Sequence, residues 1–153
     1  MADTPSKASS SDSSALAAPA VASGALLFFE LEHVLVPGRE LMLGAMRDVL
    51  AKEGIEVSPN LLMQYAECPQ PELCLADLAR ESGSTKEVTE KMVADVNEAI
   101  QQGIADLEIR KPVMKWIEAA LERKMAVAAV SYWPEEWAQL LYDHLALAAL
   151  DVR

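Results

Sequence analysis

Two short apolar runs, separated by amphipathic segments, set the pattern of this chain. Residues 25–31 read ALLFFEL and residues 125–130 read MAVAAV, with almost no polar alternation. Strands that are covered on both faces have this composition, and they occur in parallel sheets. Apolar residues recur at helical spacing between and after the two runs. The order of strand, helices, strand and helix therefore predicts a parallel α/β fold with right-handed crossovers.

Helix start and stop signals divide the rest of the sequence. Ser58 before Pro59 marks a helix start, and Ser84 with Glu87 reads as a capping box for another helix. Gly54 and Gly83 stand where helix stops belong. The predicted helices cover residues 39–52, 58–67, 71–82, 84–103, a segment opening at residue 112, and residues 134–147, while residues 148–152 resemble the start of a third strand. The stretch 58–103 exceeds one crossover and indicates an inserted helical subdomain.

Composition and charge narrow the classes of partner. The net charge of −11 repels nucleic-acid backbones and anionic lipid heads, and no apolar run approaches the roughly 18 residues that span a bilayer. Residues 1–23 are rich in Ser, Ala, Asp and Pro and lack the features of a signal peptide, so they predict a disordered tail. Cys68 and Cys74 do not form a CxxC pair. We therefore expect reduced thiols and a cytoplasmic location.

The candidate chemistry lies where the two predicted strands end. The first run ends in Glu30, Leu31, Glu32 and His33, and the second is followed by Ser131. Ligands of open parallel sheets bind at these carboxyl ends. Alternate strand residues share a face, so the two glutamates are expected to point the same way and to attract Mg²⁺ or to divide acid and base roles. The alternatives are solvated carboxylates and an ordinary loop cap at Ser131.

Two segments carry a family resemblance. LLFFELEHVLVPGRELMLGAMRDVLAKEGIEVSP resembles the opening of haloacid-dehalogenase-like (HAD-like) phosphatases of the phosphoglycolate phosphatase and phosphoglucomutase-like branch, where an apolar strand precedes Asp-x-Asp-Gly and a long helix. KPVMKWIEAALERKMAVAAVSYWPEEWAQLLYDHLAL resembles that family's second motif, a strand ending in Ser or Thr between helices. The resemblance covers residues 24–147. It implies a partial Rossmann-like core at residues 24–57 and 104–153, with a helical cap inserted at residues 58–103.

The resemblance also implies a role for each matched position. Glu30 stands at the nucleophile position and Glu32 at the acid/base position. Mg²⁺ would be bound by Glu30 and by the backbone carbonyl of Leu31. Ser131 stands at the position of the phosphate-binding hydroxyl. A small phosphate ester is the substrate class that these roles imply.

Several departures from the family pattern argue against catalysis. Each Glu carries one more methylene than the family's Asp, which moves the carboxylate by about 1.5 Å, whereas a catalytic arrangement tolerates about 0.5 Å. His33 replaces a glycine, and the family's later lysine and acidic pair have no counterpart before the sequence ends. We therefore expect a degenerate, C-terminally truncated domain, a pseudoenzyme that is not catalytic alone.

Two functions remain open, besides the option that the chain is a truncated gene product with no selected function. The first is binding of a protein partner or of a phosphate-bearing ligand, with self-association through the exposed edge of a half-sheet. The second is an Mg²⁺-dependent phosphatase that uses an unusual Glu nucleophile or is completed by another chain.

Overall fold

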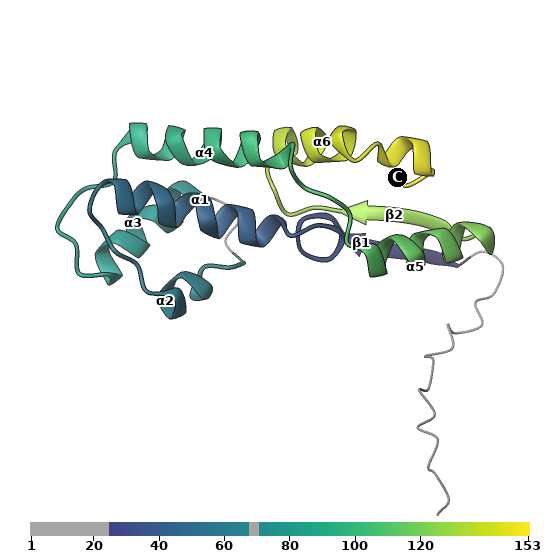
Figure 1. Cartoon of the computed structure of the whole chain (residues 1–153), viewed down its shortest axis with the longest axis horizontal. Coiled ribbons are helices and arrows are strands. Elements are labelled where there is room, and N and C mark those ends of the chain that lie inside the picture. The colour runs from purple at the N-terminus through teal and green to yellow at the C-terminus, as the bar shows by residue number, and fades with distance from the viewer. Residues whose placement is uncertain (1–24, 68–70) are drawn as a thin grey trace, which may run out of the picture.

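The computed structural model describes residues 25–67 and 71–153, so the predicted tail and Cys68 lie outside the described residues. It combines a short sheet with a larger set of helices (Figure 1). In chain order they are β1 (Leu26–Glu30), the π-helix η1 (Leu31–Leu35), α1 (Gly38–Lys52), α2 (Pro59–Gln64), α3 (Pro71–Glu81), α4 (Glu90–Ile104), α5 (Lys111–Glu122), β2 (Ala126–Val130), α6 (Glu135–His144) and the 3₁₀-helix η2 (Leu147–Leu150).

The two predicted strands form a parallel pair. The register runs from Leu26 opposite Ala126 to Glu30 opposite Val130. This confirms the predicted α/β class with a short parallel sheet. The third strand expected at residues 148–152 is reduced to one parallel bridge between Val127 and Val152, because residues 147–150 coil into a 3₁₀-helix instead.

Helices form most of the core. In α1 the buried side chains Met42, Met46, Val49 and Leu50 recur at helical spacing, and this face packs against α3 and α4. The buried residues of α4 follow the same rule, at Met92, Val96, Ile100 and Ile104. Figure 1 shows α1 to α4 grouped at one end of the molecule, with α5 and α6 beside the sheet. The division into core and cap at residues 58–103 stays a prediction.

One predicted helix start is wrong. Helix α4 begins at Glu90, where the Thr89 Oγ1 accepts the Met92 N–H (3.3 Å). Ser84 instead accepts the N–H of Lys86 (3.1 Å) and closes a local turn. Serine offers the same hydroxyl to a turn as to a helix cap, so its presence alone does not fix the start. The predicted cap at Ser58 is confirmed, since its Oγ accepts the Leu61 N–H (3.2 Å).

The expectation of reduced thiols is wrong for Cys74. This residue is buried in α3 and is disulfide-bonded. The expectation came from the usual behaviour of cysteine in a cytoplasmic compartment and not from geometry. In the part of the chain that the structure describes, no helix combines the length and the apolarity needed to cross a bilayer.

Tyr142→Phe is expected to lower the free energy of unfolding by about 1 kcal/mol. The Tyr142 hydroxyl donates to the Val152 carbonyl (2.6 Å) and ties α6 to the residue that bridges to β2. Urea unfolding measures the loss. Tyr132→Phe is the control, because the Tyr132 side chain is exposed, and it should stay within about 0.5 kcal/mol of the parent. Equal stability of both variants would contradict this role of the Tyr142 hydroxyl.

Candidate functional site at the strand ends

The backbone leaves the strand between the two glutamates. Strand β1 ends at Glu30, and Leu31–Leu35 forms a single π-helical turn that closes with the Val36 N–H donating to the Leu31 carbonyl (3.2 Å). Single π-helical turns are rare in proteins, and those that occur are often found at functional sites. The premise that Glu30 and Glu32 share a strand face is therefore wrong. Their side chains also have different partners.

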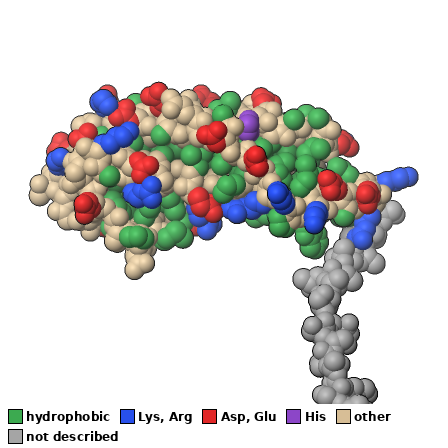
Figure 2. Space-filling view, in the orientation of Figure 1, with side chains coloured by type: hydrophobic (Ala, Val, Ile, Leu, Met, Phe, Trp, Pro, Cys, Tyr) green, Lys and Arg blue, Asp and Glu red, His purple; other side chains and the backbone are tan. Residues whose placement is uncertain are grey.

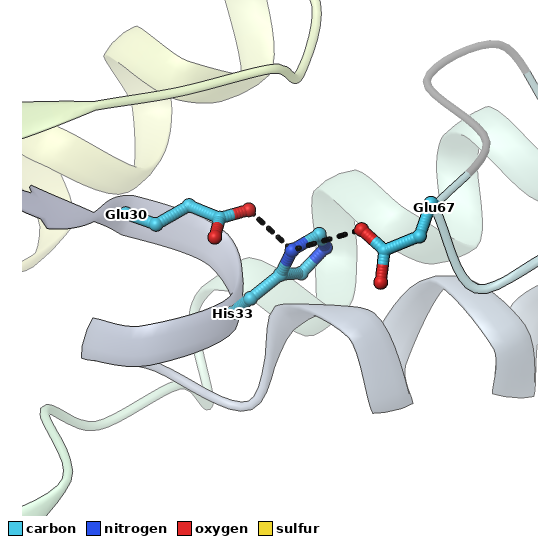
Figure 3. A group of neighbouring side chains, drawn as sticks. All are labelled: Glu30, His33 and Glu67. Atoms are coloured by element: carbon cyan, nitrogen blue, oxygen red, sulfur yellow. Dashed lines mark ion pairs between the residues drawn. The ribbon is translucent and has the colours of Figure 1, made fainter.

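The Glu30 carboxylate is paired with the imidazole of His33. The contact joins Glu30 Oε1 to His33 Nδ1 across three residues, and Glu67 Oε2 lies 3.7 Å from the same nitrogen. Figure 3 shows the two carboxylates pointing at the imidazole from opposite sides. Arg39 pairs with the other oxygen of Glu67. The carboxylate of Glu30, which stands at the family's nucleophile position, is thus already paired with a neighbouring side chain.

These three side chains are the candidate ligands for a cation. One ligand atom from each of Glu30, His33 and Glu67 lies within 4.8 Å of the others. The predicted set was Glu30 with the backbone carbonyl of Leu31, which accepts the Val36 N–H within the π-helical turn, and the role of that carbonyl as a metal ligand stays a prediction. Mg²⁺ prefers an octahedron of oxygen ligands, whereas imidazole suits zinc, copper, iron or nickel. Arg39 beside Glu67 adds a positive charge that opposes any cation. The residues therefore fit Mg²⁺ poorly.

Millimolar Mg²⁺ is expected to shift the unfolding temperature by less than about 1 °C, because a cation that is not bound gives no linkage. Differential scanning fluorimetry with and without Mg²⁺ measures this, and Ca²⁺ at the same ionic strength controls for salt. A saturable rise with Mg²⁺ that disappears in Glu30→Gln would contradict the expectation and restore a magnesium site at this strand end.

Glu32 lies in the interior, in contrast to Glu30. Its side chain is 0% exposed, and Oε1 accepts two backbone N–H groups, from Tyr132 (2.5 Å) and Trp133 (3.2 Å). Both donors follow the end of β2, and Tyr132 is 100 residues from Glu32 in sequence. The other oxygen, Oε2, has no hydrogen-bond partner among the described residues. The carboxyl group thus fastens the end of β1 to the loop after β2.

Gly38 and Trp133 pack closely beside this contact. A Cβ on Gly38 would lie 2.7 Å from the Glu32 carbonyl oxygen and 2.9 Å from two carbons of the Trp133 ring. Trp133 is buried and meets Trp137 edge to face, with ring centroids 5.9 Å apart. The start of α1 therefore needs glycine so that the π-helical turn and the indole can approach each other.

Ser131 takes part in the same loop. Its Oγ accepts the Trp133 N–H (3.1 Å), which is the local turn that the simpler alternative predicted. Ser131 also lines an open pocket of about 180 Å³. The other residues that line this pocket are Leu31, Ala129, Val130, Glu135, Ala138, Gln139 and Tyr142. The serine is therefore placed beside a hollow at the end of β2, and its role there as a phosphate-binding group stays a prediction.

Two arginines, Arg39 and Arg110, place positive charge near the start of α1. The Arg110 N–H donates to the Leu35 carbonyl (2.8 Å), and its guanidinium pairs with Glu40 Oε1 (3.1 Å). Burial acts to raise the pKa of Glu40, but its backbone hydrogen bond and the guanidinium groups of Arg110 and Arg39 outweigh burial and lower the pKa. Arg39, Glu67 and Arg110 have no signature in the sequence, because the fold brings them together from separate segments.

Comparison with known proteins gives the fold. No protein-family model matches the sequence, and no curated protein matches it. The chain is similar to a HAD family hydrolase of Deinococcus radiodurans solved with bound phosphate and sodium (TM-score 0.65, 17% identical), covering 86% of this chain and 57% of that one. It is also similar to a haloacid dehalogenase-like protein of unknown function from Agrobacterium tumefaciens (TM-score 0.64, 12% identical), covering 85% of this chain and 58% of that one.

A third similar structure is a beta-phosphoglucomutase of Clostridium difficile (TM-score 0.62, 14% identical), covering 86% of this chain and 60% of that one. The chain therefore spans less than two thirds of each of these structures. These likenesses confirm the HAD-like α/β fold that the two sequence segments predicted. At such low identity they establish the fold and not the activity.

Proposed function

We propose that this chain is a degenerate HAD-like domain that does not hydrolyse phosphate esters by itself and acts by binding. The observation that carries the proposal is the position of Glu32. A general acid must reach the proton that it transfers, within about 3 Å of the reacting group. The Glu32 carboxyl is 0% exposed and accepts the N–H groups of Tyr132 and Trp133. In this arrangement it serves the structure of the loop and not an incoming substrate.

The state of Glu30 supports the same proposal. A nucleophilic carboxylate must be free to approach phosphorus, with the reacting atoms about 3–3.5 Å apart. Glu30 is held by His33, and Glu67 lies on the other side of that imidazole (Figure 3). Freeing Glu30 would cost the His33 contact before any chemistry began.

The second candidate is an Mg²⁺-dependent phosphatase for a small phosphate ester, with Glu30 as an unusual nucleophile or with residues from another chain. The pocket beside Ser131 favours this candidate, since a hollow at the end of β2 is where a phosphate ester would bind in such a fold. The poor fit of the Glu30, His33 and Glu67 set to Mg²⁺ weighs against it.

Hydrolysis of an aryl phosphate in the presence of Mg²⁺ separates the two candidates. The parent chain is expected to release phenolate no faster than the Glu30→Ala variant, with both at the rate of the protein-free blank. Turnover that is present in the parent and lost in Glu30→Ala would overturn the proposal and make the chain an enzyme. A variant with Glu30→Asp and Glu32→Asp adds a control: activity gained only there would support a site switched off by the two glutamates.

The partner is proposed to be protein, through self-association or a second polypeptide. Strand β1 pairs with β2 along one edge only within the described residues, and Leu26 and Phe28 on one face of β1 are 48% and 59% exposed. Hydrophobic side chains lie between the charged groups on the face shown in Figure 2. An unpaired strand edge with apolar neighbours favours association. Light scattering at micromolar concentration is expected to give a mass above that of the monomer, and a monomer mass would contradict self-association.

A further inference from the structure

Two successive backbone amides converge on one oxygen atom at the end of β2. The N–H groups of Tyr132 and Trp133 lie 2.5 Å and 3.2 Å from Glu32 Oε1, measured from nitrogen to oxygen. Consecutive amides that point at one atom form a concave nest, which in proteins binds anions. The Trp133 N–H is shared with the Ser131 hydroxyl, so the loop concentrates polar groups on one small volume.

The occupant of this nest is a side chain of the same protein. Glu32 is fully buried, and its second oxygen has no hydrogen-bond partner among the described residues. Burying a carboxyl group is costly unless hydrogen bonds compensate for lost water. The two amides supply that compensation for one oxygen only. A buried acid with one oxygen unsatisfied calls for an explanation, and the two amides that hold its other oxygen are a reason for the carboxyl group to lie at this position.

We propose that the amides of Tyr132 and Trp133 form a site for a small oxyanion and that the chain fills this site with its own Glu32 carboxyl group. The native protein therefore excludes free oxyanions, such as formate or inorganic phosphate, from the end of β2. Removal of the Glu32 side chain opens the site to them. Glu32 acts in this way as an intramolecular occupant, an autoinhibitory contact that holds the anion position closed.

The first test uses the full-length Glu32→Ala variant and measures its unfolding temperature in sodium formate, sodium phosphate and sodium chloride at equal ionic strength. Formate, the anion that matches the deleted carboxyl group, is expected to raise the unfolding temperature by about 5 °C at saturation, with phosphate next and chloride without effect. The parent chain should respond equally to formate and chloride, and its general stabilisation by phosphate is subtracted from the phosphate response of the variant. An unfolding temperature of Glu32→Ala that is the same in formate and chloride would overturn the proposal.

Glu67→Ala is the matched control, because it also removes a carboxylate near the end of β1, but from an exposed position that contacts His33 and Arg39. It should show no preference for formate over chloride. A formate-specific rise in Glu67→Ala equal to that in Glu32→Ala would also overturn the proposal, since the response would then not come from the nest.

A second variant keeps the test decisive if the alanine variant does not fold. Glu32→Gln preserves the shape of the side chain but replaces the carboxyl group by an amide, which leaves one acceptor oxygen and introduces an NH₂ group that cannot accept. Hydrogen exchange of the Tyr132 and Trp133 amides is expected to be about tenfold faster in this variant than in the parent. The Arg153 amide, which donates to the Val127 carbonyl, should not change. Unchanged exchange at both loop amides would overturn the proposal.

The outcome is separate from that of the hydrolysis experiment, because it measures stability and amide exchange and not turnover. Turnover by the parent chain would overturn the proposed function and leave the anion response of Glu32→Ala unaffected. An unresponsive Glu32→Ala variant would overturn this inference and leave the proposed function standing, because the expected lack of turnover does not depend on an anion site.

Discussion

Glu32→Ala is expected to lower the free energy of unfolding by about 3 kcal/mol in chloride buffer, which would make it one of the more damaging single substitutions in the chain. The variant loses the acceptor for the N–H groups of Tyr132 and Trp133 and leaves a cavity where a fully buried side chain stood. A buried donor that loses its acceptor costs about 1–3 kcal/mol, and the cavity adds to this. Chemical denaturation followed by tryptophan fluorescence measures the change, since Trp133 reports on the same loop.

Glu30→Ala is the control for that measurement. Glu30 is partly exposed and its main partner is His33, so its removal is expected to cost no more than about 1 kcal/mol. Equal losses in the two variants, or a loss in Glu32→Ala below about 0.5 kcal/mol, would contradict the view that Glu32 fastens the two strand ends together.

Gly38→Ala is expected to cost about 2 kcal/mol. The new Cβ would lie 2.7 Å from the Glu32 carbonyl oxygen, a backbone atom that cannot move without disturbing the π-helical turn. It would also lie 2.9 Å from carbons of the buried Trp133 ring. Relief of these contacts must displace either the start of α1 or the loop after β2. Thermal unfolding of the variant measures the cost. Displacement of the loop should also change the wavelength of maximum tryptophan emission.

Gly44→Ala in the same helix is the matched control. Among the described residues, no atom outside the neighbouring turns of the helix lies within 4 Å of a Cβ built at this position in the middle of α1. Alanine should therefore stabilise the helix by about 0.5–1 kcal/mol, because glycine loses more backbone freedom on folding. The opposite signs of the two glycine variants are the prediction. A Gly38→Ala variant as stable as the parent would show that α1 and Trp133 are not closely packed.

The strands and helices were largely predictable because they depend on periodic patterns in the local sequence. The continuous apolar runs that became β1 and β2 have the composition of buried parallel strands, and the helical face of α1 repeats at the expected spacing. The start of α4 was less predictable, because Ser84 and Thr89 both carry a hydroxyl that can cap a helix. The choice between them depends on tertiary packing and not on the local sequence.

The candidate site was only partly predictable. The sequence marked Glu30, Glu32 and Ser131, and the structure brings all three to the strand ends. The sequence did not indicate that β1 ends at Glu30 and that a π-helical turn begins at Leu31. This change of backbone conformation separates the two carboxyl groups. The partners of Glu32 are backbone amides, which every residue except proline possesses, so no residue type could signal them. Glu67 approaches His33 only because the chain returns from α2.

The most direct test of the central claim is a titration of the isotope-labelled parent chain with inorganic phosphate, followed by the amide resonances of Tyr132 and Trp133. If Glu32 occupies the nest, both resonances should stay in place up to millimolar phosphate, apart from the small ionic-strength shift that chloride also produces. A saturable, phosphate-specific shift of these two amides in the parent chain would show that the site is open, and would contradict the account of Glu32 as its occupant.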